Sequence, residues 1–160
     1  MNKYTEKIKK AFSAFWKGDK YMLGIRDDKL SVRGLYACMC GCGFNCIQDK
    51  IIDMLQVMQD VLDSPEAKAD GINIDLSARI NSACRCEKHN ESKKVGGKKG
   101  SEHCTGEAVD ISPVSGSRER WWLLDAARQA GFTRIGTGKN LIHLGIGGEP
   151  KKASRVNWLY

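Results

Sequence analysis

The sequence predicts one α+β domain with a small antiparallel sheet and helices packed against it. Short apolar stretches with strand periodicity are mixed with amphipathic helical stretches, and no βαβ regularity of a doubly wound sheet is present. The 160 residues suffice for a single domain with a core of its own. Hydrophobic residues make up 41% and charged residues 28% of the chain, close to the norm for soluble globular proteins.

The N-terminal region predicts a helical extension. Within residues 1–17, Ile8 and Phe12 begin an apolar stripe at helical spacing. We therefore expect residues 1–35 to pack as an extension on a single domain that spans 1–160. The alternation in "KLSVRGLY", residues 29–36, is compatible with one strand.

The next segment predicts a loop, a helix and a strand. The cysteine- and glycine-rich run 38–46 is expected to be a loop. A helix is predicted over 48–63, ended by Ser64–Pro65, because its apolar residues recur three or four positions apart. The alternating pattern of "INIDLSARI" predicts a strand over 72–80.

The second half of the chain predicts further strands around one helix. Residues 85–102 are polar and glycine-rich, which is typical of a functional or disordered loop. A helix is expected over 117–131, with Gly131 as its C-cap. Its inward residues are expected to be Trp121, Leu124 and Ala127. Short strands are predicted from "EAVDIS", from the hairpin "FTRIGTG" and "LIHLGIG", and from "RVNWLY" as an edge strand.

The charge of the chain favours an anionic partner. The net charge is +7 and the pI about 9.1. Part of this charge lies on Lys93, Lys94, Lys98 and Lys99, which form either a solvated face or an attractor for carboxylates. No nucleic-acid-binding motif accompanies the basic residues, so nucleic acid is not expected as a partner. No stretch approaches the ~18 apolar residues of a membrane span, so membrane insertion is not expected either.

Two histidines and one aspartate suggest a metal site. In "SEHCTGEAVDIS", His103 and Asp110 lie at the two ends of a turn that enters a strand, and His143 lies on another predicted strand. Two imidazoles and a carboxylate around an open fourth position describe a catalytic zinc site. Taken singly, a histidine on an apolar strand such as His143 is more often a hydrogen-bonded core residue than a metal ligand. His89 is a further candidate, but its polar loop suggests a surface role.

The pattern Ser-x-His-x-x-Gly-x-Ala-x-Asp in "SEHCTGEAVDI" resembles the zinc-binding signature of the D-alanyl-D-alanine carboxypeptidase-like metallopeptidases, the peptidase M15 family. The order of "CMCGCGFN", "INSACRCEKHN", "VGG" and "GFTRIGTGKNLIHLG" is similar to that of its small phage endolysin-type members. The resemblance covers roughly residues 36–158. It implies a hedgehog/D-Ala-D-Ala peptidase-like fold and zinc-dependent hydrolysis of a peptide bond in bacterial peptidoglycan.

The resemblance also implies roles for individual residues. His103, Asp110 and His143 would bind Zn²⁺. Arg85 would hold a substrate carboxylate or stabilise an oxyanion, and Ser101 would bind substrate or brace the loop. Gly106 and Ala108 would be small so that the two ligand-bearing segments can approach each other.

The sequence departs from the family at the general base. Members carry an acidic residue three positions before the last histidine or an aspartate two positions after it; here these positions hold Asn140 and Gly145. The remaining candidates are Glu149, Glu107 and Glu102, and Glu149 ranks first because it can fold back over the site. The alternative function is a non-catalytic, zinc-containing peptidoglycan-binding or phage structural protein.

The setting suggested by the resemblance is that of a phage or prophage protein. The N-terminus lacks the apolar run of a signal peptide. We therefore expect synthesis in the cytoplasm, action on the cell wall after release, and a monomeric state.

Seven cysteines form a second feature. Without a secretion signal, reduced thiols or a thiolate metal site are more natural than a disulfide framework. Four of them can hold a second, structural metal: Cys38, Cys40, Cys42 and Cys86. Free thiols, a disulfide between the two segments, and a cysteine-based metal-binding protein in which His103 is incidental remain alternatives.

Overall fold

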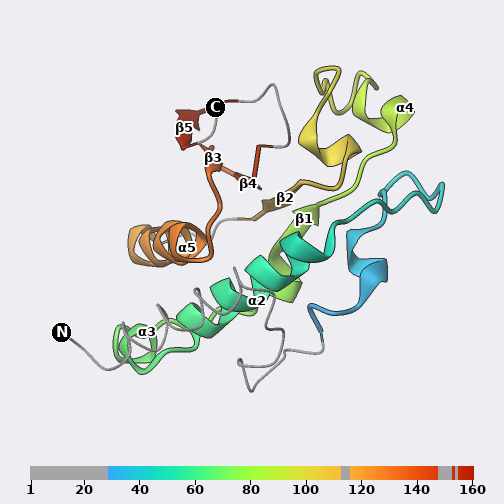
Figure 1. Cartoon of the computed structure of the whole chain (residues 1–160). Helices are drawn as coiled ribbons and strands as arrows, with labels where there is room; N and C mark the ends of the chain where they lie inside the picture. Colours follow the sequence, from blue (N-terminus) through green and yellow to red (C-terminus); the bar gives the residue numbers. More distant parts are fainter. Residues whose placement is uncertain (1–28, 113–115, 148–152, 154) are drawn as a thin grey trace.

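The computed structural model describes residues 29–112, 116–147, 153 and 155–160. The helix expected within residues 1–17 and the side chain of Glu149 lie outside these residues. The architecture is α+β: a five-stranded sheet shares one hydrophobic core with two longer helices. In Figure 1 both helices lie below the sheet, and the short helices lie at the two ends of the molecule.

The helices are Asp49–Leu62 (α2), Pro65–Ala69 (α3), Glu87–Asn90 (α4) and Ser117–Gln129 (α5). Three 3₁₀ turns accompany them: Arg33–Tyr36 (η1), Leu76–Arg79 (η2) and Glu102–Cys104 (η3). The strands are Ile80–Ser82 (β1), Ala108–Ile111 (β2), Arg134–Thr137 (β3), Ile142–Gly145 (β4) and Val156–Leu159 (β5). None of the helices in the described part of the chain has the length and apolar character needed to cross a membrane.

The strand order is β1-β2-β4-β3-β5, and this order builds the site. β2 pairs antiparallel with β4, so that Asp110 lies directly opposite His143. The hairpin of β3 and β4 and the edge position of β5 confirm the predictions made for these segments. β5 runs parallel to β3, however, which makes the sheet mixed rather than wholly antiparallel.

α2 confirms the helix predicted over 48–63. Its apolar stripe packs inward, with Ile51, Leu55 and Met58 fully buried. Pro65 occupies the first turn of α3, and the Ser64 hydroxyl accepts a hydrogen bond from the Ala67 N–H at 3.2 Å. The Ser-Pro pair therefore ends one helix and begins the next.

The strand predicted over 72–80 is wrong for most of its length, because only Ile80–Ser82 forms a strand. A side chain supplies the reason. The buried amide of Gln59 accepts from the Leu76 N–H at 2.9 Å and donates to the Ile74 carbonyl at 2.9 Å. These backbone groups are satisfied without a neighbouring strand, so the segment keeps its alternating burial but joins no sheet.

Two further predictions are corrected. Residues 29–36 form a turn and the 3₁₀ turn η1 rather than a strand, and the Tyr36 hydroxyl donates to the Leu30 carbonyl at 2.6 Å. In α5 the inward tryptophan is Trp122, whose indole N–H donates to Asp70 at 3.0 Å, whereas Trp121 is 58% exposed. Only one of two adjacent aromatic residues can face the core of a helical packing interface.

Candidate metal centre

Three side chains from different elements meet at one point. His103 lies on η3, Asp110 on β2 and His143 on β4, and all three are buried. Asp110 Oδ1 lies 2.9 Å from His143 Nδ1 and 3.2 Å from His103 Nε2. The two imidazole nitrogens are 3.3 Å apart. The structure therefore brings together the three metal ligands that the sequence suggested.

The hydrogen-bond partners of the two rings fix which nitrogens face the centre as acceptors. His103 Nδ1 lies 2.6 Å from the Ala83 carbonyl oxygen, which can only accept, so Nδ1 carries the proton. His143 Nε2 faces the carboxylate of Glu102 at 3.4 Å and carries its proton in the same way. In neutral rings, the other two nitrogens then direct lone pairs at the Asp110 carboxylate. Three acceptors that converge in a buried place are suited to holding a cation between them.

The geometry suits zinc. Ligands at 2.0–2.1 Å in a tetrahedron lie about 3.3–3.4 Å from one another. The observed separations of 2.9, 3.2 and 3.3 Å are close to that spacing. Among the described residues, the group of potential ligands has these three members, which is the number that catalytic zinc sites use.

Electrostatics keep Asp110 ionised. Burial raises the pKa of its carboxyl, but the interactions with the His103 and His143 rings, which apply when these rings carry a proton or positive charge, outweigh this and hold the pKa well below the usual range. Burial lowers the pKa of the His143 ring. The carboxylates of Asp110 and Glu102 raise that pKa by a larger amount, so the net shift is upward. Two carboxylates beside one ring form a locally negative environment that suits either a protonated imidazole or a bound cation.

Arg85 lies against the same aspartate. Its Nη2 donates to Asp110 Oδ2, the oxygen on the side away from the histidines, and its Nε donates to the Ser82 hydroxyl at 2.8 Å. The side chain is only 14% exposed. Arg85 therefore orients Asp110, a candidate metal ligand, and contact with a substrate remains a prediction.

Glu102 is the residue that sequence reasoning placed in a different role. Its carboxylate accepts from Arg134 Nε at 3.0 Å and from the Gly147 N–H at 2.7 Å, in addition to His143. Burial raises the pKa of Glu102, but these three donors lower it to about 2. With its oxygens occupied, Glu102 is suited to orienting His143 rather than to abstracting a proton.

Gly145 makes room for that carboxylate. A Cβ at this position would lie 2.9 Å from both carboxylate oxygens of Glu102. The Glu102 carboxylate thus occupies the place beside His143 where a side chain at position 145 would lie. The signal in the sequence was the coincidence of a glycine two residues after His143 with a glutamate next to His103.

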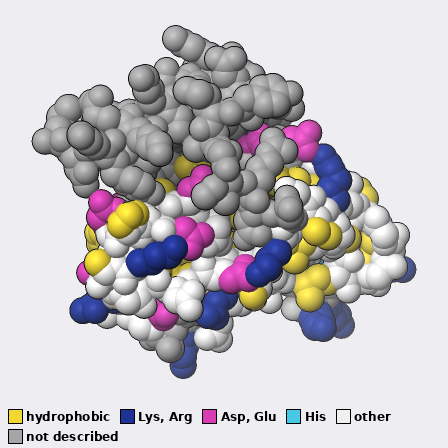
Figure 2. All heavy atoms as spheres, turned by 90° about the horizontal axis from the view of Figure 1, so that it is seen from below, with side chains coloured by type: hydrophobic (Ala, Val, Ile, Leu, Met, Phe, Trp, Pro, Cys, Tyr) yellow, Lys and Arg dark blue, Asp and Glu magenta, His cyan; other side chains and the backbone are white. Residues whose placement is uncertain are grey.

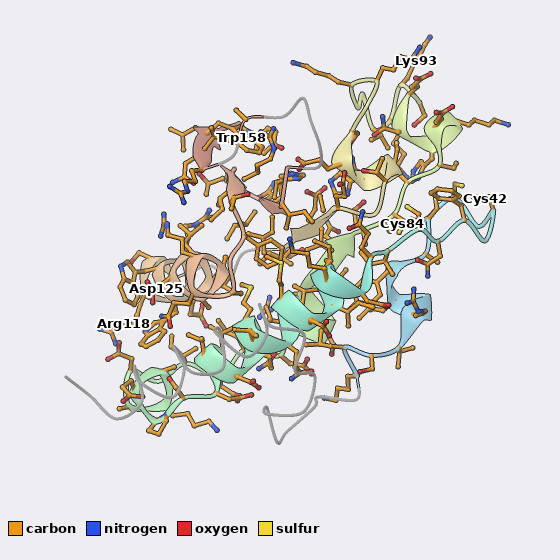
Figure 3. The ribbon with its side chains drawn as sticks, in the orientation of Figure 1. Cys42, Cys84, Lys93, Arg118, Asp125 and Trp158 are labelled. Carbon is orange, nitrogen blue, oxygen red and sulfur yellow. The ribbon has the colours of Figure 1, made fainter. Side chains whose placement is uncertain are left out.

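β5 covers another side of the centre. The Trp158 ring lies 5.4 Å from the His143 ring, and the guanidinium of Arg134 lies 5.5 Å from the Trp158 ring centre. Gly136 allows this approach, because a Cβ there would come within 2.5 Å of the indole. Figure 3 shows Trp158 on β5 at the end of the molecule opposite Lys93 and Cys42.

The other predicted residues lie as follows. Ser101 precedes η3, and its hydroxyl accepts from the His103 N–H at 3.4 Å, which braces the turn. Asn140 is exposed, and the Glu107 carboxylate accepts from the Thr105 hydroxyl at 2.5 Å. Ala108 is buried opposite Gly145. Gly106 was expected to be small so that the two ligand-bearing segments could approach each other. It lies instead against the backbone of Cys46, which is the contact that leaves no room for a side chain.

The four lysines that precede the candidate metal centre in the sequence are all exposed. Lys93, Lys94, Lys98 and Lys99 all reach solvent, and Figure 3 shows Lys93 pointing away from the body of the protein. The opposite side differs. Figure 2, seen from below in the orientation of Figure 1, shows Lys and Arg interspersed with Asp and Glu and no histidine side chain on the visible described surface.

An α+β domain in which η3, β2 and β4 bring two histidines and an aspartate together has the candidate ligand set of a metallohydrolase. A family model described as peptidase M15 matches residues 29–145, which is more than half of the chain. The chain therefore belongs to the peptidase M15 family, whose members are metallopeptidases and typically zinc-dependent. No curated protein matches the chain significantly.

Proposed function

We propose that this protein is a zinc-dependent peptidase that hydrolyses a peptide bond in the stem peptides or cross-links of bacterial peptidoglycan. The observation that carries the proposal is the convergence of three buried acceptor atoms, from His103, Asp110 and His143, in a chain of the peptidase M15 family. Zn²⁺ is the cofactor that fits this ligand set. When bound, it supplies a Lewis acid and an acidified water.

The residues of the chain have separate tasks in this proposal. The Ala83 carbonyl and the Glu102 carboxylate fix the two imidazole rings, so that each offers one nitrogen to the metal. Arg85 holds Asp110 and, with its remaining N–H groups, binds a substrate carboxylate or the oxygen that becomes negative. Ser101 contributes to substrate binding or braces η3, and Glu149 serves as general base.

The substrate class follows from charge and family. A protein with a net charge of +7 and an exposed loop of four lysines attracts anionic material, and peptidoglycan stem peptides carry free carboxylates. We further propose that the protein acts on the cell wall after release, as a phage or prophage protein would, and that it is a monomer. The positive charge is compatible with action on an anionic wall. Carboxypeptidase and endopeptidase action are both compatible with the site.

One observation favours a second candidate function. The positions that carry the family's general base hold Asn140, which is exposed, and Gly145, whose space is filled by Glu102. Loss of a general base lowers rates by roughly 10²–10⁴. The second candidate is therefore a zinc-containing protein that binds peptidoglycan, or forms part of a phage particle, without turnover.

The test uses zinc-loaded full-length protein and purified peptidoglycan fragments analysed by mass spectrometry. Peptidase activity predicts new peptide termini that appear with zinc, vanish with a chelator and are absent for His143→Ala. The cleaved bond then identifies the enzyme as a carboxypeptidase or an endopeptidase. Binding to the fragments without any new terminus would establish the non-catalytic candidate instead, and absence of both binding and cleavage would exclude peptidoglycan as the substrate.

A further inference from the structure

A second group of potential metal ligands lies outside the peptidase centre. We propose that four cysteines bind a structural Zn²⁺ which fastens the loop 38–46 to the segment that carries Arg85. The ligands are Cys38, Cys40, Cys42 and Cys86. This site is independent of the proposed peptidase activity and would remain if that activity were absent.

The distances between the sulfur atoms fit a tetrahedral thiolate site. Cys38 Sγ lies 3.4 Å from Cys40 Sγ and 3.9 Å from Cys86 Sγ, and Cys40 Sγ lies 3.7 Å from Cys86 Sγ. All four sulfur atoms, including that of Cys42, lie within 4.8 Å of one another. Zn–S bonds of 2.3 Å place tetrahedral ligands about 3.8 Å apart. A disulfide would require a separation near 2.05 Å, and all four thiols are free.

Hydrogen-bond donors surround the sulfur atoms. The Cys86 N–H donates to Cys38 Sγ at 3.4 Å, and the His89 N–H donates to Cys86 Sγ at 3.4 Å. The Nδ1 atom of His89 lies 3.2 Å from Cys38 Sγ. Donors of this kind stabilise thiolates, and four thiolates around one Zn²⁺ leave a net negative charge that a neighbouring imidazole N–H offsets. The polar-loop histidine that the sequence left without a role therefore lies beside the cluster.

The two ends of the loop are anchored, with Cys38 buried and the Cys46 N–H donating to Cys84 Sγ, but its tip is exposed. Cys40 and Cys42 are exposed, and Met39 is 70% exposed. Gly41 and Gly43 adopt positive φ angles of 78° and 75°, which bring the alternating cysteines round to one side. Figure 3 shows Cys42 on this loop at the outer edge of the molecule. Three thiols of this loop lie beside a fourth thiol that is more than 40 positions further along the chain. A metal bound by all four would therefore stabilise the exposed tip of the loop.

The remaining cysteines provide a contrast within the same chain. Cys84 Sγ accepts from the Cys46 N–H at 3.1 Å and donates to Asn45 Oδ1 at 3.4 Å. In the described residues, Cys46, Cys84 and Cys104 do not belong to a group that could hold a metal. Cys104 is therefore a matched control for a cysteine substitution.

One proposed ligand of the structural metal, Cys86, is adjacent in sequence to a residue of the peptidase centre. Cys86 follows Arg85, which contacts Asp110, and the Arg85 N–H donates to the His103 carbonyl at 2.9 Å. A structural Zn²⁺ on Cys86 would thus fix one end of the segment that orients a peptidase ligand. On binding, each cysteine thiol gives its proton to water, and the metal replaces that proton.

The experiment measures metal content per chain in full-length protein purified under reducing conditions and saturated with Zn²⁺. We expect about two zinc ions in the unaltered protein and in Cys104→Ser. Cys86→Ser and His143→Ala are each expected to retain about one. Because the two variants lose different ions, failure of the cysteine site and failure of the peptidase site give different results.

An absorption spectrum of the unaltered protein tests the cysteine site even if a variant fails to fold. Replacement of zinc by Co²⁺ is expected to give intense thiolate-to-cobalt charge-transfer absorption, which His143→Ala retains and Cys86→Ser loses. Cobalt absorption without a thiolate band would overturn the proposal. So would about one zinc per chain that is lost in His143→Ala, or a mass showing a disulfide within the cluster. Metal retained in Cys42→Ser but lost in His89→Ala would overturn the four-cysteine ligand set.

Discussion

The carboxylate of Glu102 and the Nε2 atom of His143 lie 3.4 Å apart, on the side of the imidazole away from Asp110. Asp110 Oδ1 lies 2.9 Å from Nδ1 of the same ring. His143 is therefore held between two carboxylates, one from a second candidate metal ligand and one that fixes the tautomer. Asp110 and His143 face each other through strand pairing, whereas Glu102 reaches the ring from η3.

The first prediction concerns the replacement of Glu102 by glutamine. Glu102→Gln removes the charge that pairs with Arg134 and weakens the contact that orients His143. We expect zinc affinity at this site to fall by roughly 10–100-fold, the usual effect of losing a residue that orients a metal ligand. Competition with a zinc chelator measures the change.

Glu107→Gln is the matched control, because that carboxylate contacts Thr105 rather than the histidines. It should leave zinc affinity unchanged. Unchanged zinc affinity in Glu102→Gln together with a large loss of turnover would instead assign Glu102 to proton transfer.

The second prediction separates two roles of Arg85. A lysine at this position cannot make both contacts of the guanidinium, to Ser82 and to Asp110. If Arg85 orients Asp110, Arg85→Lys should lower zinc affinity about tenfold. If it binds substrate, KM should rise at saturating zinc. We expect both changes.

Arg118→Lys is the control for this measurement. Arg118 is exposed and lies on α5, at the end of the molecule away from the metal centre (Figure 3). It should behave as the unaltered protein. A variant Arg85→Lys with normal zinc affinity and normal KM would exclude both roles.

Local pattern was sufficient where burial alone decides structure. The stripe through Ile51, Leu55 and Met58 predicted α2, since one helical face had to be buried. In α5 the same reasoning selected Trp121, because two adjacent tryptophans make the inward register ambiguous. Over 72–80 the alternation was real, but the side chain of Gln59 took the place of a neighbouring strand.

The site depended on information that a local pattern does not contain. That Asp110 lies opposite His143 follows from the pairing of β2 with β4, which is a long-range contact. The Ser-x-His-x-x-Gly-x-Ala-x-Asp signature suggested it through family resemblance. The position of Glu102 beside His143 could not be predicted from the signature. It depends on the space that Gly145 leaves in three dimensions, whereas the expected general-base positions were defined by distance along the chain.

The third prediction concerns pH and Asp60 on α2. Burial raises the pKa of this carboxyl to about 6 from its ordinary value of 3.8. The folded state therefore binds more protons than the unfolded state between these values, so the free energy of unfolding falls as pH rises through this window. Asp60→Asn removes this effect, and we expect the variant to gain stability relative to the unaltered protein as pH rises from 4 to 7.

Urea unfolding at several pH values measures the difference, and contributions from other titrating groups cancel between the two proteins. Asp53→Asn on the same helix controls for the change in helix propensity. A stability difference that stays constant from pH 4 to pH 7 would show that the pKa of Asp60 is not raised by folding.

The fourth prediction tests why position 106 is a glycine. Gly106 has a φ of 70°, and a Cβ there would overlap the carbonyl group of Cys46. The Gln48 N–H also donates to the Gly106 carbonyl at 3.1 Å, so the two segments cannot separate without losing that bond. Gly106→Ala combines left-handed strain with overpacking, which together cost about 3–5 kcal/mol. Urea unfolding measures the loss of stability.

Gly100→Ala separates the two costs. Gly100 has nearly the same φ, 73°, but a Cβ there meets no atom within 4 Å. Its replacement should cost only the backbone strain, about 1–2 kcal/mol. Equal losses for both variants would mean that the contact with Cys46 carries no energy and that the φ angle alone requires glycine. A clearly larger loss for Gly106→Ala would show that position 106 is a glycine because the turn after His103 packs closely against the end of the cysteine loop.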